Sequence, residues 1–156
     1  MELIKSFESS DARFGAAGPL LLALYRGTTS PGMMEELDRA QGKLLEKFPR
    51  ISTFTVIGQP AALLKVDDQV RSRSVELGKK YERSVLGSAI VVTTKGLGAV
   101  MVRTFLTGFF LLSRSETPMK TFSTLGEGLG WVQGLPGQDL AIKTALSVGE
   151  LERFFA

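Results

Sequence analysis

The hydrophobic and polar positions divide the chain into short segments with two different periods. A polar start is followed by two apolar segments, 12–17 and 20–25, which flank the pair Gly18-Pro19. A Gly-Pro pair between two apolar runs is typical of a tight turn. The pattern therefore predicts that these two segments form an opening β-hairpin.

Two longer segments repeat their apolar residues every three or four positions, as one face of a helix does. The first begins after Ser30 and Pro31 and ends at Pro49. A serine cap followed by proline in the first turn is a common helix start, so the sequence predicts a helix there. The second segment covers about 66–85, and we expect Gly87 to end it.

Three further segments are short, apolar and rich in β-branched or aromatic residues: 51–57, 89–93 and 119–122. Such runs, bounded by glycine or proline, are typical of strands. The remaining pattern predicts a helix over about 98–114, another that starts at Thr124, and one or two amphipathic helices in the tail.

Strands that alternate with helices indicate a mostly parallel sheet. We therefore predict an α/β fold: a mostly parallel central sheet of about five strands, with an antiparallel opening hairpin and helices packed on it. The chain of 156 residues has room for one domain. We expect this domain to cover 12–135, with an N-terminal extension over 1–11 and a C-terminal helical extension over 136–156.

The amino-acid composition mainly excludes classes of catalytic and metal-binding site. The chain contains neither cysteine nor histidine. These residues supply the usual zinc and haem ligands, the catalytic thiol and the base that titrates near neutral pH. No paired carboxylates stand in a catalytic context either. We therefore expect no enzyme activity, no catalytic residues, no cofactor and no metal.

Charge and hydropathy exclude two kinds of partner. The net charge is +3, and no basic stripe with interleaved aromatic residues accompanies it, so we expect no nucleic-acid binding. The longest apolar run, 97–112, contains Arg103 and is shorter than the roughly 20 residues of a membrane-spanning helix. We therefore expect no membrane span and a cytoplasmic protein.

Two stretches of the sequence resemble a known protein family. The first is Leu24-Tyr25-Arg26-Gly27, with Thr28 and Thr29 leading into the first helix; the second comprises Gly96, Gly98, Val102-Arg103, Leu106-Thr107-Gly108, Pro118, Lys120, Phe122 and Trp131. They resemble STAS-like domains (sulfate transporter and anti-sigma factor antagonist), especially small stand-alone bacterial versions. The resemblance covers most of 12–133. It implies a non-enzymatic protein-interaction or regulatory module, with another protein of unknown identity as its partner; some such domains sense nucleotides or small ligands.

The chain departs from that family in one loop. Anti-sigma factor antagonists carry a phosphorylatable serine or threonine at the start of the helix after the central strand. Here the loop 58–65 contains no hydroxyl residue, so the chain lacks what a phosphoswitch would need at that position. The segment after Pro136 also lies outside the resemblance.

The predicted helix over 98–113 is apolar around nearly its whole circumference, so one side needs a cover besides the sheet. Two explanations stay open: the C-terminal helix of the same chain, or a partner interface such as a homodimer. A third alternative is an apolar ligand pocket under this helix. The expected partner surface comprises Phe105, Phe109, Phe110, Leu151, Phe154 and Phe155.

A second candidate site is the turn Gly96-x-Gly98. Between a strand and a helix, such a turn can bring backbone amides close to a phosphate, and Lys95 and Arg103 would supply positive charge. Met101 stands where a dinucleotide fingerprint has its third glycine, and this favours a packing turn. The alternative function is therefore a small-ligand or nucleotide-binding sensor that uses this turn.

Overall fold

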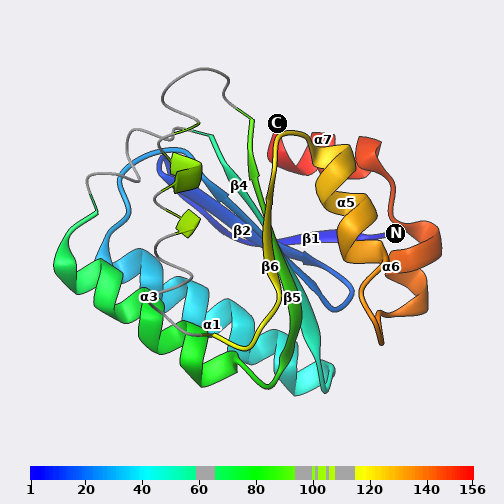
Figure 1. Cartoon of the computed structure of the whole chain (residues 1–156), viewed down its shortest axis with the longest axis horizontal. Helices are drawn as coiled ribbons and strands as arrows, with labels where there is room; N and C mark the ends of the chain where they lie inside the picture. The colour runs from blue at the N-terminus through cyan, green and yellow to red at the C-terminus, as the bar shows by residue number, and fades with distance from the viewer. Residues whose placement is uncertain (59–65, 94–99, 101, 105, 108–114) are drawn as a thin grey trace.

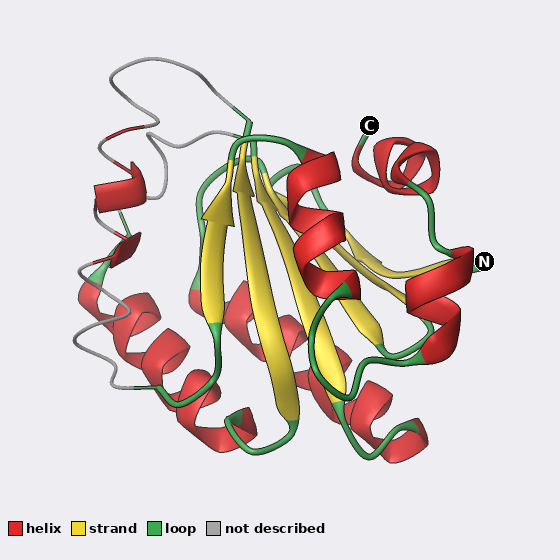
Figure 2. Ribbon diagram, turned by 45° about the vertical axis from the view of Figure 1, so that its right-hand side comes forward, coloured by secondary structure: helices red, strands yellow, loops and turns green. Residues whose placement is uncertain are grey.

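The computed structural model describes residues 1–58, 66–93, 100, 102–104, 106–107 and 115–156. Within this part of the chain, helices lie on both faces of a six-stranded sheet (Figures 1 and 2). The strands follow one another in chain order across the sheet: β1 (Leu3–Glu8), β2 (Ala12–Ala17), β3 (Leu20–Tyr25), β4 (Ile51–Ile57), β5 (Val85–Val92) and β6 (Met119–Phe122).

The sheet is mixed. Strands β1, β2 and β3 are antiparallel, whereas β3, β4, β5 and β6 are parallel to their neighbours. The predicted hairpin is confirmed: β2 pairs with β3 around Gly18, whose φ of 54° is a conformation that favours glycine. The predicted α/β fold is therefore confirmed, and β1 adds an antiparallel edge strand from within the segment 1–11.

The helices form a layer on each face of the sheet (Figure 2). Helices α1 (Pro31–Lys47) and α3 (Asp68–Tyr81) cover one face. Helices α5 (Leu125–Gln133), α6 (Leu140–Ala145) and α7 (Val148–Phe155) cover the other. No helix among the described residues is long and apolar enough to cross a membrane.

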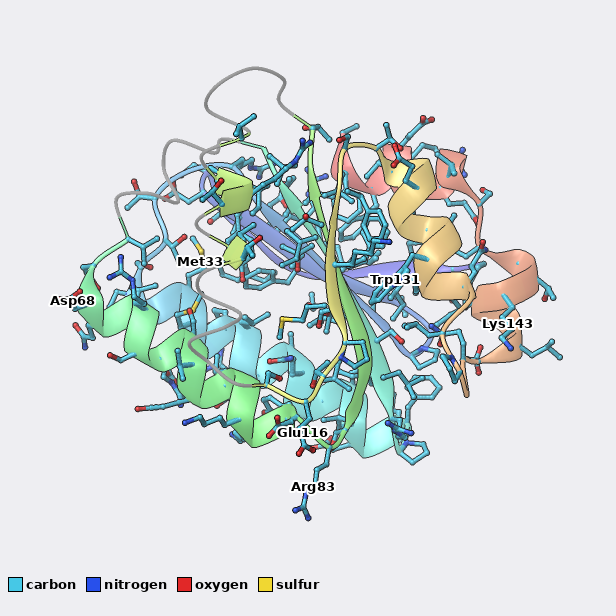
Figure 3. The ribbon with its side chains drawn as sticks, viewed as in Figure 1. Met33, Asp68, Arg83, Glu116, Trp131 and Lys143 are labelled. Atoms are coloured by element: carbon cyan, nitrogen blue, oxygen red, sulfur yellow. The ribbon has the colours of Figure 1, made fainter. Side chains whose placement is uncertain are left out.

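Alternation along the strands creates a separate core on each face, because successive side chains of a strand point to opposite sides. Leu21 of β3 packs in the core under α1 and α3, and Leu22 packs in the core under α5 and α7. Met33 of α1 and Trp131 of α5, labelled in Figure 3, belong to these two opposite layers. Both faces of the central strands are buried, as their continuous apolar runs predict.

The prediction for α3 is wrong at its end. The helix ends at Tyr81, and Val85 already belongs to β5, where it pairs with Ile51 of β4. Gly87 therefore lies inside a strand and does not end the helix. A Cβ there would lie 2.8 Å from the side chain of Leu135, just after α5, and 3.1 Å from that of Trp131 in α5, so these residues approach the strand closely at this position.

Candidate functional site

Most residues of the two predicted sites lie outside the described residues. These are Lys95, Gly96 and Gly98 of the glycine turn and Phe105, Phe109 and Phe110 of the apolar helix. Arg103 is described: its guanidinium donates a hydrogen bond of 2.6 Å to the hydroxyl of Ser123 at the end of β6. This contact ties the segment 102–104 to the edge of the sheet.

The tail residues of the expected partner surface pack within the chain. Leu151 of α7 is 0% exposed, and the ring of Phe155 lies 5.8 Å from that of Phe54, centroid to centroid. Val102 and Leu106 instead pack with the ends of β4 and β5 on the face that α1 and α3 cover. Helix α7 and these two residues therefore lie on opposite faces of the sheet, and the structure does not bring them together.

A cavity of about 240 Å³ lies between α1, α3 and the sheet, and we call it the α1/α3 pocket. Its walls are mainly aliphatic side chains: Met34, Leu37, Ile57, Val70, Leu77 and Ile90. Leu106 also lines it, so part of the predicted apolar helix contributes to the wall. On α3 the wall includes two small residues one turn apart, Ser74 and Gly78, and this leaves room between the helices.

One polar group in the pocket has no partner. The side chain of Gln41, on α1, is 8% exposed and lines the pocket. Within the described part of the chain, its carbonyl oxygen Oε1 is the one buried side-chain polar atom without a hydrogen bond. Buried polar groups are nearly always hydrogen-bonded, so this oxygen requires an explanation.

Two of the hydroxyl-bearing residues in the wall, Ser74 and Tyr25, need no charged partner from a ligand. The hydroxyl of Ser74 donates a hydrogen bond of 2.9 Å to the backbone carbonyl oxygen of Val70 in the same helix. Burial raises the pKa of the Tyr25 phenol well above its usual range, so this group stays neutral at physiological pH. Both groups therefore present uncharged surfaces to the pocket.

Among the described lining residues, the single charged side chain is that of Arg71. It is 44% exposed, and its guanidinium lies 3.5 Å from the carboxylate of Asp68 on the same helix. The charge of Arg71 is therefore shared with a neighbouring carboxylate and open to solvent.

A cluster of charged groups joins the two helices beside the pocket. Asp38 of α1 pairs with Arg73 at 3.1 Å and with Lys80 at 2.8 Å, and it accepts a hydrogen bond from the hydroxyl of Tyr81. Burial by itself raises the pKa of Asp38, but the hydrogen bonds from Lys80 and Tyr81 and the charge of Arg73 outweigh it, so the pKa is lowered. Asp38 therefore stays ionised and holds α1 against α3.

Sequence reasoning kept an apolar ligand pocket under the predicted helix over 98–113 as one alternative, and Leu106 of that segment does line the α1/α3 pocket. It did not predict the contribution of α1 and α3, although one signal was present. Gln41 stands four residues after Leu37 and three before Leu44, which places it on the apolar face of the helix. A polar residue inside such a stripe indicates either a buried hydrogen bond or a binding site. Its neighbours in the pocket come from segments too distant in the chain for a local pattern to show them.

Comparisons with protein-family models, with curated proteins and with solved structures find no match for this chain. What the structure shows is an α/β domain with a mixed sheet of six strands among its described residues. Any function must therefore be argued from the geometry of the site.

Proposed function

We propose that this domain binds a small, largely apolar molecule in the α1/α3 pocket and carries out no chemistry on it. The observation that supports this most directly is an apolar cavity into whose described lining one buried polar atom without a hydrogen bond falls, Oε1 of Gln41. Apolar walls with a few placed polar groups are the usual composition of small-molecule sites. The charged cluster around Asp38 supports a preformed pocket, because it holds the two helices together.

The volume of the pocket limits the size of the ligand. An apolar cavity of about 150 Å³ holds benzene. The α1/α3 pocket, at about 240 Å³, has room for a ligand of one or two fused rings, or for an aliphatic chain of similar volume.

This proposal specifies how the expected regulatory module would work, since its state would depend on a bound ligand. In a STAS-like domain, a ligand between α1 and α3 would be sensed, and its presence would be passed to a protein partner. The family resemblance and the partner remain proposals. The glycine turn adds no support for a second site, since its residues lie outside the described part of the chain.

To test this proposal, leucine substitutions fill the pocket, and binding of two bicyclic probes, indole and indene, is measured for each variant. A Cβ added at Gly78 meets nothing within 4 Å, so a leucine there can be accommodated and takes up space in the pocket. Gly78→Leu is the test variant, and Ser74→Leu, one turn away, is a second. Gly130→Leu is the matched control, because Gly130 is also a helical glycine with open space but lies in α5 on the other face.

We expect the wild type and Gly130→Leu to be stabilised by the probes and the two filled variants not to be. At ten times its Kd, a probe adds about 1.4 kcal/mol by linkage, which corresponds to a rise of about 3–6 °C in Tm for a domain of this size. Differential scanning fluorimetry measures the shift, and NMR shift changes locate the probe. Absence of binding to the wild type, or equal binding by Gly78→Leu and wild type, would contradict the proposal.

A further inference from the structure

The unpartnered oxygen of Gln41 also indicates which chemical group the ligand carries. This inference rests on the proposed function, because it concerns the occupant of the same pocket. Oε1 is a carbonyl oxygen and can only accept hydrogen bonds. A buried acceptor without a partner is unfavourable, whereas an N–H or O–H group placed against it restores the lost hydrogen bond. The acceptor therefore selects for a donor on the ligand.

The one unpartnered, buried side-chain acceptor found among the described residues calls for one donor, and most of the remaining wall favours an apolar body. The hydroxyl of Ser74 already has an acceptor in Val70, so it requires nothing from a ligand. The aliphatic side chains of Leu37, Ile57 and Leu77 offer only apolar contact. A second polar group that faced these aliphatic side chains would lose its hydration without regaining a hydrogen bond from them.

The charges around the pocket favour an uncharged ligand. Arg73 and Lys80 of α3 both pair with Asp38 of α1, so these charges are compensated between the two helices. Arg71 lies beside Asp68 and is open to solvent. An ionised group inside the apolar part of the pocket would have no buried counter-charge among the described lining residues, and an unpaired buried charge is strongly unfavourable.

We infer that the ligand is an uncharged molecule with an apolar body of one or two rings and a single N–H or O–H donor, which points at Oε1 of Gln41. Indole has the required chemistry and is a suitable probe. Two probes of nearly the same shape as indole separate the contribution of the donor from that of the apolar body. Indene has no polar atom, and benzoxazole has acceptors but no donor. Indole-2-carboxylate tests the effect of a negative charge.

The test measures the Kd of each probe, by NMR titration, for the wild type, Gln41→Met and Gln69→Met. Methionine has nearly the shape of glutamine without its hydrogen-bonding groups. Gln69, exposed on α3 and not part of the pocket wall, gives the matched control for the same substitution. We expect the wild type and Gln69→Met to bind indole about tenfold more tightly than indene. In Gln41→Met this preference should disappear, and indene should bind at least as tightly as indole, because the N–H of indole then has no acceptor.

Each contrary outcome has a separate meaning. If indole and indene bind the wild type equally, the requirement for a donor is overturned while the pocket itself stands. Tightest binding of benzoxazole would also overturn it, because Gln41 would then present its N–H group. Tightest binding of indole-2-carboxylate would overturn the uncharged class. If no probe binds, the proposed function fails and this inference fails with it.

Discussion

At the residue scale, single charged side chains connect parts of the chain that are distant in sequence. Glu8 at the end of β1 accepts a hydrogen bond of 2.6 Å from Arg13 of β2 and one of 3.1 Å from Arg26, just after β3. The hydrogen bond from Arg13 is the largest influence on the Glu8 carboxyl. With the contribution of Arg26, it lowers the pKa of Glu8 to about 2 despite an opposing effect of desolvation. One carboxylate therefore links the three antiparallel strands.

The lowered pKa predicts how this contact responds to acid. The folded chain holds Glu8 ionised more strongly than the unfolded chain, so its contribution to stability is complete above the ordinary pKa of 4.5 and is lost as the pH falls towards 2. We expect a carboxyl NMR titration of Glu8 to have its midpoint at about 2. Glu8→Gln should make unfolding less dependent on pH in this window. A midpoint near 4.5 would show that the arginine contacts do not form in solution.

At the element scale, each described helix of eight or more residues begins at a side chain that caps it. Ser30, Asp67, Thr124 and Ser147 each accept a hydrogen bond from the backbone N–H three residues later. These caps satisfy N–H groups that the first helical turn leaves free. Local sequence therefore determines where the helices start, whereas helix interiors also depend on what packs against them.

Helical glycines give a prediction at this scale. A Cβ at Gly78 or Gly130 would meet nothing within 4 Å, whereas a Cβ at Gly128 would lie 3.0 Å from the side chain of Val91. Alanine is favoured over glycine in a helix by about 1 kcal/mol. We therefore expect Gly78→Ala and Gly130→Ala to raise the free energy of unfolding by about 0.5–1 kcal/mol, and Gly128→Ala to lower it. Urea denaturation measures all three, and a stabilised Gly128→Ala would show that α5 can move away from the sheet.

At the scale of the whole molecule, the C-terminal helices complete one of the two cores. Leu151 of α7 packs with Leu22 of β3 and Phe54 of β4, residues that lie far from it in sequence. Arg13 of β2 also donates hydrogen bonds to the carbonyl oxygens of Phe154 and Ala156. The segment 136–156 therefore packs as part of the sheet's helical layer.

This packing predicts the effect of truncating a side chain in α7. Leu151→Ala should lower the free energy of unfolding by about 2–5 kcal/mol, because it removes a buried side chain from a close-packed core. Leu140→Ala is the control; Leu140 is 72% exposed, and its change should stay within about 0.5 kcal/mol. Light scattering should give the same molar mass for both variants as for the wild type. A smaller mass for Leu151→Ala would instead assign α7 to an interface between subunits.

The amino-acid sequence by itself determined the elements whose signals are local. The segments 12–17, 20–25, 51–57 and 119–122 are strands with the predicted bounds, and Ser30 caps α1 as predicted. In each case the period of apolar residues and a glycine, proline or serine beside it carry the information within a few residues. Such signals do not depend on the rest of the fold.

Tertiary structure decided the remaining features, because they depend on residues that are distant in the chain. The segment 3–8 is mostly exposed and has little apolar pattern, and pairing with β2 makes it a strand. Val85 belongs to β5 and not to the predicted helix, because it pairs with Ile51 of β4. The α1/α3 pocket is lined by residues that range in sequence from Tyr25 to Leu106. Oε1 of Gln41 lacks a hydrogen bond because no group among the described residues that pack around it donates to it. A pattern of apolar and polar positions shows which side of a helix is buried, but the partners of a buried group are determined only when the layers pack.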